Sequence, residues 1–301
     1  MKKYLFTLFF LATFFVFPTF VSSQNQGNNV AEKIDKSYGK FMKITSACMN
    51  REFPMLVFTP AGYEKDQKSY PVVYMLHGTN DMPFTEDGLR KMNNPTTHVK
   101  EMADIFRVII VIPLVGNTYF MDSPVLKESK IATFISQELT AFIDTNFRTE
   151  ANRNGRILSG FSMGGYGAVS LLCRYPDIFS VAIARAGVLN LATGVEDLSW
   201  DNVGDNATNL LGDYFTNKMN YHHNNCFNLV NHIRDRKDIA FVIEVGKEDF
   251  LYKTNFAFHQ RLNELKIPHI YNETEGGHVW NENTLRSLLS NLQYFNKTQY
   301  R

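Results

Sequence analysis

Short, almost entirely apolar segments recur along this chain and alternate with longer segments of helical periodicity. The strand candidates are residues 54–60, 71–78, 107–113, 156–162, 180–187 and 240–246, with a weaker one at 268–274. Helical patterns lie between or after them, at residues 129–147, 164–175, 254–266 and 281–295. Near-continuous Val and Ile runs are typical of strands covered on both faces, and their alternation with helices favours a parallel sheet. The sequence therefore predicts an α/β fold with a mostly parallel central sheet and helices on both faces.

This alternation stops at residues 188–238, a segment that is rich in asparagine and has no clear strand periodicity. We expect helices and loops inserted between two strands there. His222 and His223 lie in this insertion and could be mistaken for a metal-binding pair. Adjacent residues do not share a face of a helix or strand, so we interpret both as solvent-exposed loop residues. No other sequence pattern indicates a metal site or a phosphate-binding loop, and we expect no cofactor.

The first 23 residues have the pattern of a cleavable export signal. Lys2 and Lys3 precede a long Phe/Leu-rich run that closes on small residues ending at Ser23. The alternative is a membrane anchor, because the run approaches the roughly 20 residues that span a bilayer, but Pro18 and the small residues favour cleavage. We therefore expect a secreted or periplasmic protein with a signal peptide over 1–23, a flexible lead-in over 24–39 and one α/β domain over 40–301.

The charge and the cysteine content limit the partners and the cross-links of the exported chain. Cleavage after residue 23 removes two lysines and no acidic residue, which leaves 29 basic and 30 acidic residues. A nearly neutral surface offers no electrostatic footprint for nucleic acid. Three cysteines allow at most one disulfide. Cys173 lies in an apolar helical context typical of a buried thiol, whereas a Cys48–Cys226 bridge stays open, since spacing alone does not establish a pairing.

The stretch RILSGFSMGGYGAVSLL joins a predicted strand to a predicted helix through a serine surrounded by glycines. Ser162 lies between Gly160 and Gly164, and Gly165 and Gly167 follow closely. Glycine is unfavourable inside strands and helices, so the cluster indicates crowded backbone at a sharp reversal. The pattern G-x-S-x-G at a strand-to-helix junction is typical of the nucleophile elbow of α/β hydrolases. A tight glycine turn with an incidental serine is the alternative, and the placement favours the nucleophile.

A serine nucleophile requires a general base and an orienting acid, which in this fold follow in the order Ser, Asp/Glu, His. We expect His278 to be the base, because EGGHVW lies between the last predicted strand and the last predicted helix. His259 and His269 fall within a predicted helix and a predicted strand, and we interpret them as structural. The acid is expected just beyond the preceding strand, where Asp249 is the first choice and Glu248 the alternative.

The oxyanion of an acyl-transfer intermediate needs preorganised hydrogen-bond donors. The first is expected to be the backbone N–H of Met163, the residue after the nucleophile. The second comes from the loop that follows residues 71–78, and we place it at the N–H of Thr79. His77 ends that strand, and we expect it to brace the loop.

With these motifs in order, the chain resembles the putative esterase family of α/β hydrolases. This family includes S-formylglutathione hydrolases, tributyrin esterases, feruloyl and acetylxylan esterases of carbohydrate esterase family 1, and mycolyltransferases. The resemblance runs from about Phe41 to Phe295. It is carried by FTPAGYEKDQKSYPVVYMLHG, GNTYFMDSP, GFSMGGYGAVSLLCRYPDIFS and GKEDFLYKTNFAFHQRLNELKIPHIYNETEGGHVW. It implies Ser162 as nucleophile, Asp249 as acid and His278 as base.

The resemblance also implies a substrate pocket. In relatives the segment matching GNTYFMD lines the acyl or alcohol pocket, which implicates Tyr119 and Phe120, and Trp280 is placed near them. Two departures stand out. HGTNDMPFTEDG lacks a further glycine and aromatic residue found in many relatives, and GGHVWNEN lacks their second tryptophan. We therefore expect a more open or more polar pocket near Trp280.

Export and the resemblance together predict a serine carboxylesterase acting on short-chain or carbohydrate-linked esters, such as acetyl or feruloyl esters. The expected partner is a small or polysaccharide-linked ester, with no nucleic acid and no stable membrane insertion after cleavage. An acyltransferase of the mycolyltransferase type would use the same three residues. A thioesterase resembling S-formylglutathione hydrolase is less expected for an exported chain. A catalytically silent binding protein is disfavoured by the intact set of serine, acid and histidine.

Overall fold

The computed structural model describes residues 39–79, 96–192 and 203–279, and within these ranges eight strands form one sheet. The strands are β1 (Lys40–Ser46), β2 (Arg51–Phe58), β3 (Val72–Leu76), β4 (Ile109–Pro113), β5 (Arg156–Phe161), β6 (Val181–Arg185), β7 (Ala240–Gly246) and β8 (His269–Thr274). They lie in the order β1-β2-β4-β3-β5-β6-β7-β8. β2 is antiparallel to β1 and to β4, and all other neighbours are parallel. The predicted α/β fold with a mostly parallel sheet is confirmed.

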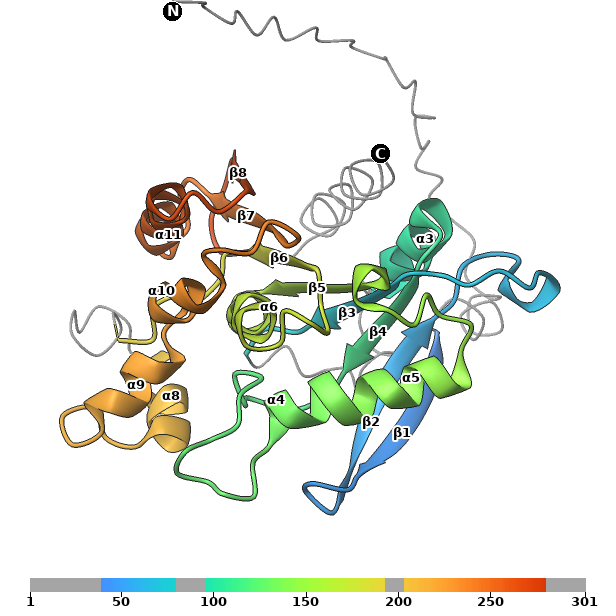
Figure 1. Cartoon of the computed structure of the whole chain (residues 1–301), viewed down its shortest axis with the longest axis horizontal. Helices are drawn as coiled ribbons and strands as arrows, with labels where there is room; N and C mark the ends of the chain where they lie inside the picture. Colours follow the sequence, from blue (N-terminus) through green and yellow to red (C-terminus); the bar gives the residue numbers. More distant parts are fainter. Residues whose placement is uncertain (1–38, 80–95, 193–202, 280–301) are drawn as a thin grey trace, which may run out of the picture. The chain divides into compact units, whose positions relative to one another are not determined.

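Helices connect the strands and cover the sheet (Figure 1). They are α3 (Thr96–Phe106), α4 (Ile131–Thr133), α5 (Thr140–Asn146), α6 (Met163–Arg174), α8 (Val203–Leu211), α9 (Lys218–Asn224), α10 (Cys226–Leu229) and α11 (Tyr252–Glu264). A π-helical segment, Phe134–Leu139, joins α4 to α5, so that these three form one continuous helix. Its Phe134 ring lies 4.6 Å from the ring of Phe53 on β2 and fixes this helix against the sheet.

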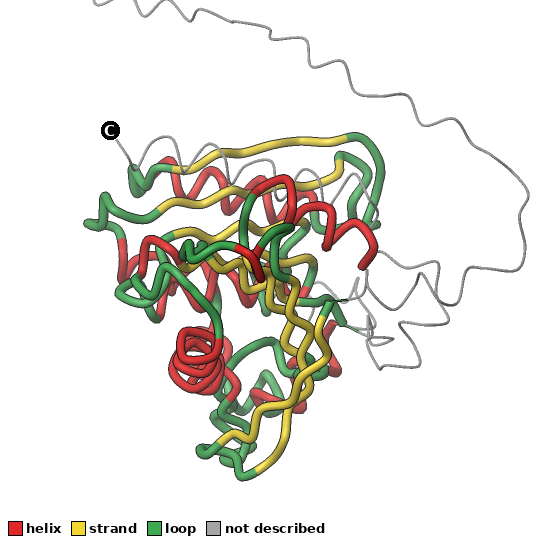
Figure 2. The backbone as a smooth tube through the Cα atoms, turned by 90° about the vertical axis from the view of Figure 1, so that its right-hand side faces the viewer, coloured by secondary structure: helices red, strands yellow, loops and turns green. Residues whose placement is uncertain are grey.

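The hydrophobic core has two large parts, one on each face of the sheet, and a small third cluster of Phe161, Ala186 and Val245. Successive side chains of a strand point to opposite faces, and β3 shows this directly. Val72, Tyr74 and Leu76 pack with α4, α5, α6 and α11, whereas Val73 and Met75 pack with α3. Figure 2 shows the strands as one twisted layer. Burial on both faces explains why the parallel strands appear in the sequence as continuous apolar runs.

The insertion after β6 packs against α6. The hydroxyl of Tyr166 on α6 donates to Asn224 O at 2.8 Å, and Arg174 Nη2 donates to Asn224 Oδ1 at 2.7 Å. At the other end of the insertion, Ser123 Oγ donates to Leu210 O on α8 at 2.6 Å. The predicted helical insertion at 188–238 is therefore present and is anchored to the helix that follows Ser162.

Several predicted features fall outside the described residues. These are the signal peptide over 1–23, nearly all of the lead-in over 24–39, and the helix at 281–295. Among the helices that the structure does describe, none has both the length and the apolar character required to cross a bilayer.

Candidate active site

Ser162 lies on the sharp reversal between β5 and α6. Its backbone has φ 56° and ψ −117°, outside the regions that a residue with a side chain normally adopts. The turn is held by Ser162 N–H, which donates to Arg185 O at 3.0 Å, and by Ser162 O, which accepts from Tyr166 N–H at 3.1 Å. This conformation places the serine at the carboxyl edge of the sheet, ahead of the N-terminus of α6.

Glycines make this reversal sterically feasible. A Cβ atom on Gly160 would clash with the backbone of Gly164, and a Cβ on Gly164 would clash with the carbonyl of Leu76 at the end of β3. A Cβ on Gly167 would lie 2.6 Å from the ring of Phe120. Close approach of backbone, as predicted from the sequence, accounts for Gly160 and Gly164, whereas Gly167 makes room for the Phe120 ring.

A continuous hydrogen-bonded line connects Ser162 to a histidine and a buried carboxylate. His278 Nε2 lies 3.0 Å from Ser162 Oγ. His278 Nδ1 lies 3.1 and 3.0 Å from the two carboxylate oxygens of Asp249. Because a carboxylate only accepts, Nδ1 carries the ring proton and Nε2 is left as the acceptor for the serine hydroxyl. The structure thus brings together the three residues that the sequence analysis selected from separate segments.

Asp249 is held in a fixed orientation just beyond the end of β7. Its side chain is fully buried, and Oδ1 also accepts the backbone N–H of Leu251 at 2.8 Å. Glu248, the alternative acid, is exposed at the surface, and its backbone N–H donates to Gly276 O at 3.1 Å. Of the two candidates, Asp249 is therefore the one that contacts His278, while the main chain of Glu248 is hydrogen-bonded to the loop that carries His278.

That loop, residues 275–279 after β8, is tied to the end of β7. Lys247 N–H donates to Thr274 O at 2.8 Å, next to the Glu248–Gly276 hydrogen bond. Gly276 has φ 89°, in the region that favours glycine. The paired glycines in EGGHVW thus allow the loop to turn tightly back over β7 and to present His278 toward the serine.

Aromatic rings flank the imidazole. The ring centroid of Phe161 lies 4.6 Å from that of His278, and the centroid of Phe250 lies 4.4 Å from it. Phe161 is buried and Phe250 is 55% exposed. The other late histidines lie elsewhere: His259 Nδ1 is 2.7 Å from His269 Nε2, in a contact between α11 and β8. Their interpretation as structural residues agrees with this position.

The expected oxyanion donors lie at the same edge of the sheet. Met163 is the first residue of α6, so no carbonyl of a preceding helical turn accepts its N–H. Thr79 follows β3 and is half-buried. His77 Nδ1 donates to Gly78 O at 2.9 Å, and its Nε2 accepts Val115 N–H at 3.4 Å. His77 therefore links the loops after β3 and β4, as expected of a brace.

The resemblance implies that Tyr119 and Phe120 line a substrate pocket, where part of each side chain would be exposed. The structure differs from this expectation. Tyr119 and Phe120 both have positive φ values, and both side chains are completely buried. The Tyr119 ring packs edge-on against Tyr166, and burial raises its pKa well above the usual value. Both side chains pack against α6, Tyr119 on Tyr166 and Phe120 on Gly167, and neither is exposed to solvent. Trp280 lies outside the described residues.

The cysteines are unpaired, so the open alternative of a Cys48–Cys226 bridge is not realised. Cys48 is exposed on the turn between β1 and β2, where its Sγ lies 3.4 Å from Ser46 Oγ. Cys226 begins α10 and is buried, as is Cys173 on α6. Burial raises the pKa of both buried thiols, which favours the unreactive protonated form. No group of three potential metal ligands occurs among the described residues.

A buried ion pair that was not predicted from the sequence lies beneath the histidine loop. Arg185, at the end of β6, donates from Nη1 to Glu244 Oε1 on β7 at 2.6 Å and to Thr274 Oγ1 at 2.7 Å. The arginine and glutamate side chains are only 4% and 1% exposed. The available signal was a single charge inside each of two otherwise apolar segments, SVAIARAG and AFVIEVG.

The strand order, the turn at Ser162 and the position of the histidine loop after β8 define an α/β hydrolase. The sequence profile of the family described as "Putative esterase" matches residues 46–291, and the chain belongs to this family. The resemblance inferred from the sequence motifs is thus confirmed.

Known proteins of similar sequence and structure agree with this assignment. An esterase of Mycobacterium tuberculosis is 27% identical over 257 residues, which cover 76% of this chain and 53% of that protein. The chain therefore spans about half the length of that relative. An acetyl esterase of Caldicellulosiruptor saccharolyticus is 25% identical over 234 residues, covering 71% and 79% of the two chains. A solved ferulic acid esterase superposes with a TM-score of 0.65 at 24% identity, over 86% of this chain and 97% of its own, which shows the shared fold.

Proposed function

We propose that the chain is an exported serine carboxylesterase that hydrolyses short-chain or carbohydrate-linked esters through Ser162, His278 and Asp249. The observation that carries the proposal is the line of hydrogen bonds from the buried carboxylate through the imidazole to the serine hydroxyl. An ordinary serine hydroxyl is a weak nucleophile, and it gains reactivity from a base held within hydrogen-bonding reach.

In the acylation half of the reaction, Ser162 Oγ forms a bond to the ester carbonyl carbon while its proton passes to His278 Nε2. The carbonyl oxygen becomes an oxyanion, which the N–H groups of Met163 and Thr79 stabilise. Collapse of this intermediate breaks the bond to the alcohol oxygen. The leaving alcohol takes the proton from His278, and the acyl group stays on Ser162 as an ester.

In the deacylation half, a water molecule gives its proton to His278 Nε2 and attacks the acyl carbon. The second oxyanion collapses, the bond to Ser162 Oγ breaks, and His278 returns the proton to the serine. Asp249 stays ionised throughout; it holds the ring proton on Nδ1 and stabilises the imidazolium formed in each half-reaction. Its full burial and its additional hydrogen bond from Leu251 N–H support this fixed role.

The names of relatives support acyl groups of the acetyl and feruloyl type. One relative is an acetyl esterase, and another, from Xylanibacter ruminicola, is an endo-1,4-beta-xylanase/feruloyl esterase that is 26% identical over 157 residues. The basic start and apolar run of residues 1–23 support export. N-terminal analysis of the protein recovered outside the cytoplasm is expected to begin at Gln24; a chain still starting at Met1 would contradict export by cleavage.

The experiment that tests the activity is a panel of acetyl, butyryl and feruloyl esters with the wild type and with Ser162→Ala. We expect wild-type hydrolysis of at least the acetyl ester. In Ser162→Ala hydrolysis is expected to fall to background, with a melting temperature close to that of the wild type. Residual activity within tenfold of the wild type would refute the assignment of the nucleophile. Added sugar that captures most of the acyl group in place of water would reassign the enzyme as an acyltransferase.

A further inference from the structure

Two phenyl rings contact the imidazole of His278, and both come from residues next to the other members of the site. Phe161 ends β5 and directly precedes Ser162, and Phe250 directly follows Asp249. Phe161 is buried, whereas Phe250 is more than half exposed. The rings therefore meet the imidazole from the core side and from the solvent side.

The geometry of these contacts suits an attraction to a positive charge. The imidazole centroid lies 4.6 Å from that of Phe161, with 35° between the ring planes, and 4.4 Å from that of Phe250, with 43° between the planes. A cation within about 6 Å of a phenyl centroid is attracted by the negative face of the ring. By comparison, the Phe120 ring lies 5.3 Å from that of His77 at 63°. The two rings on His278 are thus closer and less edge-on.

The imidazole must carry a charge in a site that is largely shielded from water. The side chain of His278 is 19% exposed, and that of Asp249 is fully buried. Removing a charge from water is unfavourable unless neighbouring groups compensate it. Asp249 compensates the charge at Nδ1, and Nε2 faces the hydroxyl of Ser162. Both nitrogens are thus occupied by groups of the site, and the phenyl rings provide the remaining contacts described above.

We propose that Phe250, together with Phe161, stabilises the imidazolium that His278 becomes when it takes up a proton from Ser162 or from water. The inference rests on the proposed function, in which this cation forms during both acylation and deacylation. The attraction is weak while the imidazole is neutral and strong once it is charged, so it favours the transition states over the bound substrate. Phe250 acts through His278 and is therefore a positioning residue for the reaction.

A ring that only fills space or excludes water would behave differently. Such a ring acts equally on the neutral and on the charged imidazole, and its effect depends on its shape alone. The attraction proposed for Phe250 depends instead on the electrons of the ring, whose negative face arises from the π-system. Fluorine substituents withdraw electron density from that face and change the shape of the ring very little. Fluorination of Phe250 therefore distinguishes the two roles.

The test replaces Phe250 by 4-fluoro-, 3,5-difluoro- and 3,4,5-trifluorophenylalanine, each introduced by suppression of a stop codon at that position. We expect kcat for an acetate ester to fall stepwise with fluorination, to about 2- to 30-fold below the wild type with three fluorines. KM is expected to change by less than about twofold, as for an interaction made only in the transition state. Phe250→Leu should lose as much, and Phe250→Tyr should retain the wild-type kcat. A trifluoro protein with wild-type kcat would overturn the inference.

A direct contact between an exposed phenyl ring and the substrate is the alternative, and two substrates separate it from the proposal. Ethyl acetate and phenyl acetate differ in the alcohol part, but the same imidazolium forms with both. We expect kcat/KM to fall by the same factor for the two esters in each fluorinated protein. A loss confined to phenyl acetate, or a change in KM alone, would overturn the inference and assign Phe250 to substrate binding.

Phe256 is the matched control, because it is also an exposed phenylalanine near a histidine. It lies on α11, and its ring centroid is 6.0 Å from that of His259, which is outside the line of residues that contains Ser162. The same fluorinated residues at this position, and Phe256→Leu, are expected to leave kcat at the wild-type value. Thermal unfolding of every protein shows that it is folded. Equal losses of kcat at Phe250 and Phe256 would overturn the inference.

Phosphonylation separates this inference from the proposed function. Labelling of Ser162 by an alkyl fluorophosphonate needs no ester substrate, yet the serine proton still passes to His278. If the wild type hydrolyses neither ester, the proposed function fails, and the second-order rate constant of labelling still decides the inference. A stepwise fall of this constant with fluorination of Phe250 would support the inference, and equal constants would overturn it. A wild type that is not labelled at all would overturn both.

Discussion

The buried ion pair between Arg185 and Glu244 offers a quantitative test of how the sheet supports the histidine loop. Replacing Arg185 by Met removes the guanidinium that pairs with the Glu244 side chain, which is 1% exposed, and it removes the hydrogen bond that Arg185 donates to Thr274 Oγ1. Breaking a buried pair from one side costs about 3–5 kcal/mol, because an uncompensated charge stays in the core. Each kcal/mol shifts Tm by roughly 2–4 °C in domains of 150–250 residues, so Arg185→Met is expected to lose about 6–20 °C.

The double variant Arg185→Met/Glu244→Leu distinguishes a buried charge from a packing defect. Replacing both members of a buried pair by apolar residues is often neutral or stabilising, so most of the lost Tm is expected to return. Thermal unfolding followed by circular dichroism measures both variants under the same conditions. A single variant that loses less than 2 °C, or a double variant no more stable than the single one, would refute this reasoning.

The same pair is expected to position the loop that carries His278. The double variant recovers stability without recovering the hydrogen bond to Thr274, so its kcat is expected to stay below the wild-type value with little change in KM. Thr274→Val, which removes only the hydroxyl, is expected to lower kcat in the same way, and Thr274→Ser is expected to restore it. Equal kcat values for the Val and Ser variants would show that the hydroxyl has no positioning role.

Three further results are expected. Asp249→Asn should lower kcat by about 10⁴-fold at nearly unchanged KM, because an amide holds the wrong imidazole tautomer; a loss below tenfold in steady-state assays would contradict that role. Under native conditions a maleimide should label Cys48 alone, with the other two cysteines reacting only after denaturation; native labelling at three sites by mass spectrometry would disprove their burial. Burial and the neighbouring His269 lower the pKa of His259 below its usual 6.5, so the unfolded chain binds more protons there. The contribution of neutral His259 to the free energy of unfolding is complete above pH 6.5 and is lost as the pH falls through the lowered pKa of this residue. The Tm of the wild type should therefore drop on acidification, and the Tm of His259→Gln should drop by less. An identical drop in the two proteins would show that His259 does not contribute to the loss of stability.

The sequence predicted the parallel strands well because both faces of each are buried. β5, β6 and β7 carry apolar runs broken only by single polar or charged residues, and their observed bounds lie within the predicted segments or match them. β1 was not predicted, since its burial alternates weakly and its first residues are exposed. Helix α3 was also missed, although Val99, Met102, Ala103 and Phe106 follow the i, i+3, i+4, i+7 spacing of an amphipathic helix and pack against the sheet.

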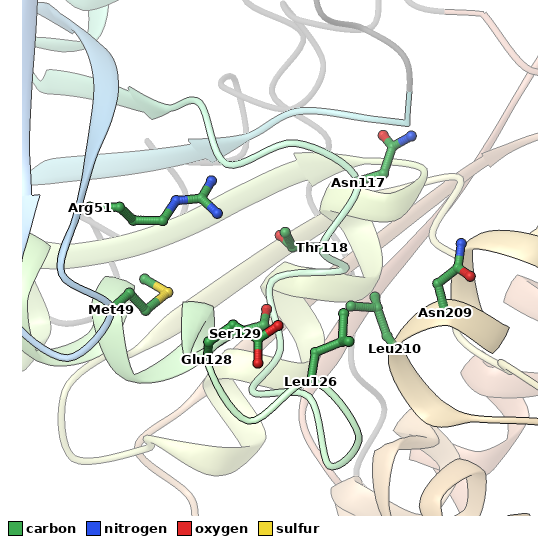
Figure 3. Close-up of a pocket in the computed structure, with 9 residues that line it drawn as sticks. All are labelled: Met49, Arg51, Asn117, Thr118, Leu126, Glu128, Ser129, Asn209 and Leu210. Carbon is green, nitrogen blue, oxygen red and sulfur yellow. The ribbon is translucent and has the colours of Figure 1, made fainter.

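The residues of the site were predictable where the chemistry requires a particular residue type. The exposure of its neighbours was less predictable, because it depends on tertiary packing. Ser162, Asp249 and His278 each follow a strand and carry a group that acyl transfer needs. The exposure of Tyr119 and Phe120 depends on how the loop after β4 lies against α6, which is set by contacts distant in the sequence. A surface pocket lined by Met49, Thr118 and Leu210, among others, joins three segments that are distant in the sequence, so no local pattern could have indicated it (Figure 3).

The most direct test of the central claim is covalent labelling of the folded wild type with an alkyl fluorophosphonate, followed by peptide mapping. Such a reagent phosphonylates a serine only where a base activates the hydroxyl and donors stabilise the tetrahedral phosphorus. We expect one modification, on Ser162, that is absent in Ser162→Ala. No modification of the folded protein, or one on a different serine, would contradict the assignment of Ser162 as the activated nucleophile.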